Sequence, residues 1–124
     1  MSKQATQFLA AKADVLTGSS QSVVGAITVA RTKGIPWFGT QWSQTSLAPK
    51  QVVSSQIYDW TGTLDKIFTR IQAGKLGGAA YTLTLKNGGE KIQFNPGFAL
   101  PANVKAAAQK AITGIQTGKI HVPQ

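Results

Sequence analysis

The sequence from Asp14 to Gln44 reads DVLTGSSQSVVGAITVARTKGIPWFGTQWSQ. It contains two short apolar runs, Asp14–Thr17 and Ile35–Phe38, and a glycine follows each of them. Short apolar runs that end at a turn residue are typical of buried strands. Because the residues between the two runs have helical spacing, this stretch predicts a strand, a helix and a second strand.

The helix is predicted from its apolar stripe and its two ends. Its apolar residues recur at positions i, i+1, i+4 and i+7 and are Val23, Val24, Ile27 and Ala30. We expect Ser19 and Ser20 to cap the first turn, because serine hydroxyls accept hydrogen bonds from free N–H groups there. We expect Gly34 to end the helix, because glycine readily adopts a left-handed conformation.

A strand–helix–strand unit with short connections predicts parallel strands covered by helices. In such sheets, ligands bind beside the carboxyl ends of the strands. The carboxyl end is at Thr17–Ser20 for the first strand and at Gly39–Ser43 for the second. We therefore expect a binding site at this edge of the sheet.

Other elements extend this unit. A helix over residues 3–13 precedes it, and a third strand over residues 52–57 completes a core region at 14–58. A helix follows over residues 61–74, and its apolar positions suggest a face that packs in the core. Those positions are Leu64, Ile67, Phe68 and Ile71.

The last third of the chain predicts a β-hairpin and a helix. Apolar and polar residues alternate on both sides of Asn87–Gly89, a strong turn signal, so we expect a hairpin over residues 80–95. A helix over residues 101–118 begins with Pro101, a favourable first helical residue. The whole chain, residues 1–124, is the size of one α/β domain.

Composition excludes several classes of protein. The chain has no cysteine and one histidine, so we expect no metal site and no cofactor. Its net charge is +9, but the basic residues are spread singly and only two are arginine. We therefore expect no specific nucleic-acid partner. Asp59 and Asp65 do not form an evident acid–base pair, and phosphate-binding motifs are missing, so we expect no catalytic residue and no enzyme.

Several segments carry a resemblance to a known family. They are residues 13–44, LAP at 47–49, VVSSQIYDW at 52–60, GKLGG at 74–78, LKNGG at 85–89, LPANVK at 100–105 and GKIHVP at 118–123. In this order they resemble the second half of the basic membrane protein family, the nucleoside-type substrate-binding proteins of ABC transporters.

The resemblance implies a type I periplasmic-binding-protein fold, in which two lobes close over a ligand. This chain is expected to form about half of it: a three-layer α/β structure with a mainly parallel sheet, plus the C-terminal hairpin and helix. The resemblance also implies a small-molecule solute, an ABC permease as partner and a periplasmic or cell-surface lipoprotein. The N-terminus lacks the apolar segment of a signal peptide, which favours the cytoplasm for a complete gene product.

The resemblance assigns the ligand to the strand ends. Gly18 allows close approach of the backbone, Ser19 and Ser20 offer N–H and hydroxyl donors, and Gln41 is expected to bond a polar edge of the ligand bidentately. Trp42 or Tyr58 stacks on its ring, with Asp59 beside them. Many members of the family have an acidic residue at the position of Gln41 and a lysine at that of Tyr58.

Two other functions stay open. The first lobe of the family lies outside this chain, so the apolar faces of 61–74 and 80–85 lack their cover. We therefore expect a homo-oligomer or a separate partner chain that supplies the missing lobe. A structural protein that self-associates through a reduced binding lobe is one alternative, and a basic nucleic-acid-associated domain is another.

Overall fold

The structure, a computed structural model, describes residues 1–123. By their internal contacts these residues form two compact units. Unit 1 contains Met1–Ile57 and Ile92–Pro101, and unit 2 contains Tyr58–Lys91 and the chain from Ala102 onward. Whether the two units make up one domain stays a prediction.

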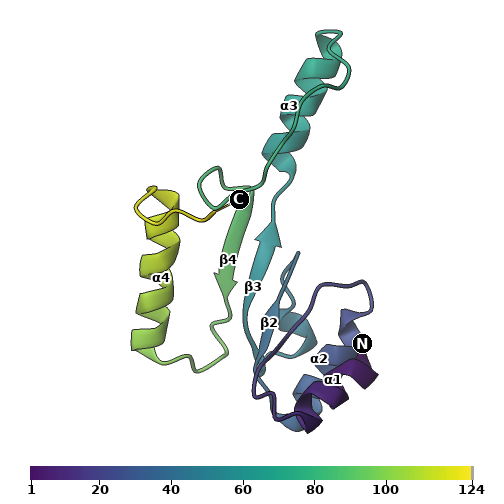
Figure 1. The fold of residues 1–124 in the computed structure, drawn as a ribbon, viewed down its shortest axis with the longest axis vertical. Helices are drawn as coiled ribbons and strands as arrows, with labels where there is room; N and C mark the ends of the chain where they lie inside the picture. Colours follow the sequence, from purple (N-terminus) through teal and green to yellow (C-terminus); the bar gives the residue numbers. More distant parts are fainter. Residues whose placement is uncertain (124) are drawn as a thin grey trace. The chain divides into compact units, whose positions relative to one another are not determined.

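The sheet has four strands in the order β1-β2-β3-β4. The first three are β1 (Leu16–Thr17), β2 (Trp37–Gly39) and β3 (Val52–Tyr58). β1 pairs in parallel with β2, and β2 pairs in parallel with β3, which confirms the predicted parallel neighbours. Figure 1 shows β2 and β3 side by side. β1 is shorter than the predicted strand, because pairing with β2 begins only at Leu16.

The fourth strand, β4 (Glu90–Phe94), runs antiparallel to β3 (Figure 1). The Asn95 N–H donates to the Val53 carbonyl over 3.0 Å, and the Asp59 N–H donates to the Gly89 carbonyl over 2.8 Å. The predicted hairpin over residues 80–95 is therefore wrong, because its two halves do not pair as strands. Residues 81–86 form no strand, and β4 instead pairs with the longer, partly buried β3.

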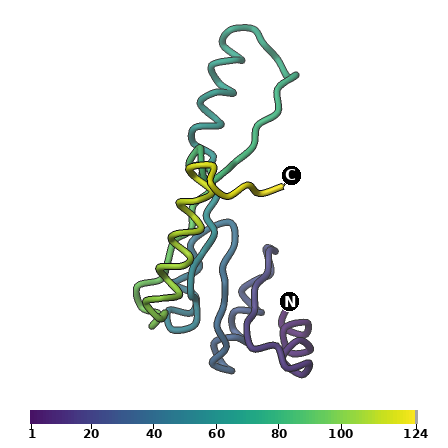
Figure 2. Tube along the Cα trace, turned by 60° about the vertical axis from the view of Figure 1, so that its left-hand side comes forward, coloured from purple at the N-terminus to yellow at the C-terminus, as the bar shows by residue number. Residues whose placement is uncertain are grey.

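The turn of that predicted hairpin does form, through the side chain of Asn87. Its Oδ1 accepts hydrogen bonds of 2.9 Å from the N–H groups of Thr84 and Gly89. Its Nδ2 donates to the Thr82 carbonyl over 2.8 Å. Backbone groups of Thr82 and Thr84, before the turn, thus bond the Asn87 side chain instead of a neighbouring strand. Figure 2 shows the chain leaving along a helix of unit 2 and returning through this irregular segment.

Two helices lie side by side in unit 1, α1 (Ser2–Ala10) and α2 (Val23–Lys33) (Figure 1). The end of α2 is as predicted, since Gly34 has φ = 69°. Its start is not: Ser22 precedes the helix, no side chain caps it, and Ser20 Oγ accepts the Ser22 N–H. Val24 is exposed, and the inward stripe is formed by Val23, Ala26, Ile27 and Ala30.

The hydrophobic core belongs to unit 1 and joins both helices to the sheet. Trp37 and Ile27 are each 1% exposed, and Val52 is fully buried. Its other buried members are Ala5, Leu16, Val23, Ala26, Ala30 and Ala48. A short 3-10 helix, η1 (Thr45–Leu47), leads from the β2 loop toward β3.

Unit 2 contains α3 (Thr61–Gln72) and α4 (Ala102–Gln116). The expectation that the apolar face of α3 lies in a core is wrong for this chain. None of its residues is buried, and Leu64, Phe68 and Ile71 are 47%, 61% and 49% exposed. Ile67 is half-buried, and with Ala79 and Tyr81 it lines a shallow groove, so the returning segment covers only one flank of the helix. No helix within residues 1–123 has both the length and the apolarity needed to cross a membrane.

Candidate ligand-binding site

The loops after β1 and β2 are joined at the carboxyl-end edge of unit 1. The Thr17 hydroxyl donates to the Phe38 carbonyl over 2.8 Å, and the Thr40 hydroxyl donates to the Gly18 carbonyl over 2.7 Å. The first bond connects the end of β1 to β2, and the second connects the loop after β2 to the loop after β1. The two loops therefore present a single edge, at the place where parallel sheets bind ligands.

Ser19 and Gln41 face each other across this edge. Gln41 Nε2 donates to Ser19 Oγ over 2.9 Å, and both side chains are exposed. Gln41 has φ = 73°, in the left-handed region that residues other than glycine rarely occupy. Such a conformation costs on the order of 1–3 kcal/mol and persists only where the surroundings fix it.

A buried glutamine supplies that fixation. Gln44 is 1% exposed, and its Oε1 accepts the Trp37 indole N–H over 2.7 Å. Its Nε2 donates to the Thr40 carbonyl over 3.0 Å, and its backbone N–H donates to Ser55 Oγ over 3.1 Å. Gln44 therefore ties the loop that carries Gln41 to the side chains of β2 and β3.

Glycine at position 39 is required by the same network. A Cβ at Gly39 would lie 2.6 Å from Ser55 Oγ and 3.0 Å from Gln44 Oε1. A side chain there would displace the groups that hold the loop. Neither Gln44 nor Ser55 was singled out from the sequence, because a polar residue in a loop rich in Ser, Thr and Gln gives no sign of burial.

The other predicted site residues of unit 1 are Trp42, Ser20 and Gly18, and they differ in exposure and in the groups they contact. Trp42 is 48% exposed, and its backbone N–H donates to the Thr40 carbonyl over 2.9 Å. Ser20 Oγ lies 3.0 Å from Ser22 Oγ and so faces the start of α2. A Cβ at Gly18 would lie 3.0 Å from Met1 Cε, so the protein's own packing also explains a small residue there.

Tyr58 and Asp59 belong to unit 2. Asp59 Oδ2 forms an ion pair of 2.7 Å with Lys91 Nζ, and Oδ1 accepts the Thr61 N–H over 3.1 Å. The hydrogen bond from Lys91, followed by those from Thr61, lowers the pKa of Asp59 from 3.8 to about 2. Tyr58 is 37% exposed and lines a shallow pocket with Trp60, Tyr81 and Leu83.

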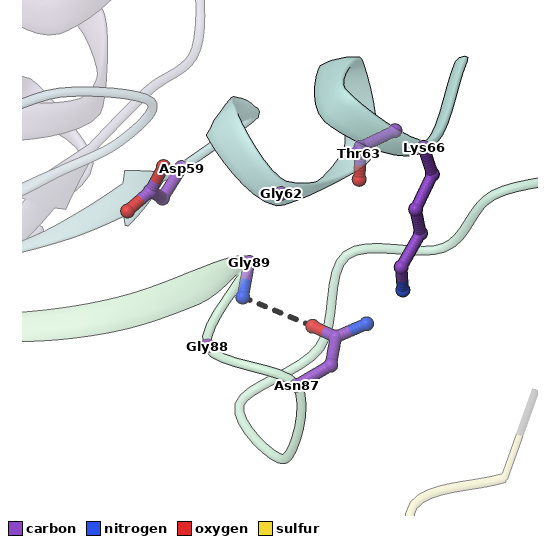
Figure 3. Close-up of a pocket in the computed structure, with 7 residues that line it drawn as sticks. All are labelled: Asp59, Gly62, Thr63, Lys66, Asn87, Gly88 and Gly89. Atoms are coloured by element: carbon purple, nitrogen blue, oxygen red, sulfur yellow. Dashed lines mark hydrogen bonds between the residues drawn. The ribbon is translucent and has the colours of Figure 1, made fainter. Parts of the chain in front are cut away.

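Unit 2 also contains a small polar pocket of about 80 Å³ beside the start of α3 (Figure 3). Figure 3 shows Lys66 reaching from α3 toward the loop that carries Asn87. The pocket is well below the roughly 300–1,000 Å³ of sites that enclose a ligand of drug size. We place the candidate site at the edge of unit 1 because the carboxyl ends of the parallel strands β1 and β2 lie there. Within residues 1–123, no three His, Asp or Glu side chains gather as metal ligands would.

Two solved structures resemble this chain over 98% of its length. One is described as a transcriptional activator of the comK gene from Bacillus halodurans, with a TM-score of 0.78 and 19% sequence identity. The other is an ABC transporter system solute-binding protein from Conexibacter woesei, with a TM-score of 0.68 and 18% identity. The chain spans 43% and 41% of the lengths of these two proteins. No protein-family model matches the chain, and a search of curated proteins found no match.

At these identities the likeness concerns the fold alone. It confirms the predicted fold class, an α/β structure with the mainly parallel sheet of a periplasmic-binding-protein-like domain. The ligand, the basic membrane protein family and the lipoprotein character stay predictions.

Proposed function

We propose that this chain is the ligand-binding part of a solute-binding protein and binds an uncharged heterocyclic solute such as a nucleoside. The observation that carries the proposal is the edge formed by the β1 and β2 loops. It combines the exposed polar pair Ser19 and Gln41 with Trp42, the residue after Gln41, which is 48% exposed. Polar groups fix the orientation of a ligand, and an indole offers a stacking surface for its ring.

Five residues have roles in this proposal. Ser19 and Gln41 bond the polar edge of the solute, and Trp42 stacks on its ring. Gly18 and Ser20 complete the loop after β1. We propose a structural role for Asp59 at the turn between β3 and α3, because Lys91 and Thr61 already bond its two carboxylate oxygens. A ligand contact by Tyr58 stays a prediction.

The proposal also names a partner protein and a location, and it assigns no catalysed reaction to the chain. A chain of this kind delivers its solute to an ABC permease, at the cell surface or in the periplasm, and does not change it. The likeness to the solute-binding protein of Conexibacter woesei supports this proposal at the level of the fold.

The experiment is a titration of tryptophan fluorescence with inosine and uridine. We expect quenching, with a dissociation constant of about 0.1 mM or weaker, roughly −5 kcal/mol. The affinity is low because a single edge leaves one face of the ligand in water. Trp42→Phe should remove most of the response. Trp60→Phe is the matched control, because Trp60 is 51% exposed but lies in unit 2. Quenching that survives Trp42→Phe and is lost in Trp60→Phe would contradict the proposed site.

A second candidate function is binding of nucleic acid. The net charge of +9 favours it, as does the description of the Bacillus halodurans neighbour as a transcriptional activator. Binding that neutralises phosphates weakens steeply between about 50 and 200 mM salt, whereas binding of a neutral nucleoside changes little. Tight binding of a short DNA duplex at low salt that is lost at high salt, without a nucleoside response, would establish this second function.

A third candidate is self-association without a ligand. The exposed apolar face of α3 favours it, because monomeric proteins rarely expose large contiguous apolar patches. A stable oligomer that responds to neither nucleosides nor DNA would establish this assembly function.

A further inference from the structure

We infer that the edge of unit 1 selects solutes that carry a hydrogen-bond donor directly beside an acceptor, as in the –NH–C=O edge of a lactam ring. This inference rests on the proposed function and deepens it. It follows from the hydrogen bonds of four side chains at this edge, which are Thr17, Ser19, Thr40 and Gln41.

The two threonine hydroxyls are already committed to the protein. Thr17 donates its single proton to the Phe38 carbonyl of β2 over 2.8 Å, and Thr40 donates its proton to the Gly18 carbonyl of the loop after β1 over 2.7 Å. A hydroxyl has one proton to donate. Neither threonine hydroxyl therefore has a donor left for a solute: Thr17 joins the two strand ends, and Thr40 joins the two loops.

Ser19 and Gln41 each have one hydrogen-bonding group available for a solute. Gln41 Nε2 donates to Ser19 Oγ, which leaves the Ser19 proton as a donor. Within residues 1–123, no hydrogen bond engages Oε1 of Gln41, which is therefore an available acceptor. The 2.9 Å bond keeps this donor and this acceptor next to each other. Their complement on a solute is an acceptor beside a donor.

The pair is also held in place before a solute arrives. Gln41 keeps a strained left-handed backbone at φ = 73°, and Gln44 fixes the preceding Thr40 carbonyl from inside the unit. A preorganised pair loses less conformational entropy on binding than a mobile one. Residues 17–20 and 40–44 contain no ionisable side chain, so a charged group on the solute would find no counter-charge from them.

The test compares inosine, which has a lactam N–H beside its carbonyl, with 1-methylinosine, in which a methyl group replaces that hydrogen. For the unaltered chain we expect inosine to bind about tenfold more tightly, because methylation leaves the Gln41 acceptor without a partner. In Gln41→Gly, inosine should weaken about tenfold to the level of 1-methylinosine, whose own affinity changes little. Glycine suits the left-handed backbone at this position, so the variant is expected to fold.

Ser19→Ala gives the complementary result. It removes the donor that faces the carbonyl, which both solutes keep, so both should weaken by a similar factor. Equal binding of inosine and 1-methylinosine to the unaltered chain would overturn this inference and leave the proposed function intact. Absence of any response to either solute at millimolar concentration would overturn both.

Discussion

At the scale of single residues, the site depends on a side chain that no ligand would touch. Gln44 is buried, bonds the Trp37 indole and the Thr40 carbonyl, and so fixes the backbone that places Gln41. Trp42 and Gln41 were predicted as site residues because they follow a strand end. Gln44 was not, because its role depends on a buried partner seven residues away in sequence, and sequence spacing does not reveal that pairing.

Replacing Gln44 should therefore destabilise unit 1. Gln44→Met keeps the approximate length of the side chain but leaves the Trp37 N–H buried without an acceptor. We expect a loss of about 1–3 kcal/mol in the free energy of unfolding, measured by urea denaturation. Gln4→Met is the matched control, because Gln4 is exposed on α1 and its replacement should change stability by less than about 0.5 kcal/mol. Equal stabilities of the two variants would contradict the role given to Gln44.

At the scale of elements, the parallel strands were predictable and the pairing of β4 was not. The apolar runs and glycines of residues 14–44 are local signals, and they specify β1, α2 and β2. The partner of β4 depends instead on which strand edge is free, and this is a property of the assembled sheet. The turn signal at Asn87–Gly89 correctly predicted a turn. The Asn87 side chain, however, bonds backbone groups of Thr82, Thr84 and Gly89 that the strands of a hairpin would have paired with each other.

The junction of β3, α3 and β4 should respond to acid. The pKa of Asp59 in the folded chain is about 2, below its ordinary value of 3.8, because Lys91 and Thr61 bond the carboxylate. A lowered pKa means that the stabilisation is complete above the ordinary value and is lost as the pH falls through the folded one. Urea unfolding of the unaltered chain and of Asp59→Asn should therefore show a gap near neutral pH that closes as the pH approaches about 2. A gap that stays constant would show that this ion pair does not contribute to stability.

At the scale of the whole molecule, unit 1 has a continuous core and unit 2 leaves an apolar helix face exposed. The helix and its apolar spacing were predicted, but burial was not predictable from spacing. An apolar stripe indicates a face that needs a partner, and it does not say whether the same chain supplies one. The solved structures from Bacillus halodurans and Conexibacter woesei that resemble this chain are both more than twice as long as it is.

We expect the chain to self-associate through α3. Sedimentation velocity at micromolar concentration should show an oligomer, and Phe68→Lys should weaken it by placing a charge on the apolar face. Phe8→Lys is the control, because Phe8 is 59% exposed, like Phe68 at 61%, but lies on α1 in unit 1. A stable monomer, or equal weakening by both substitutions, would contradict this role of α3.

The central claim is that the edge formed by the β1 and β2 loops binds an uncharged heterocycle. The most direct test is to titrate isotope-labelled protein with inosine and to follow each amide signal by nuclear magnetic resonance. The account predicts that the largest shifts occur at the backbone amides of Ser19, Gln41 and Trp42 and at the Gln41 side-chain amide. Shifts confined to residues of unit 2, or no shift at millimolar inosine, would contradict it.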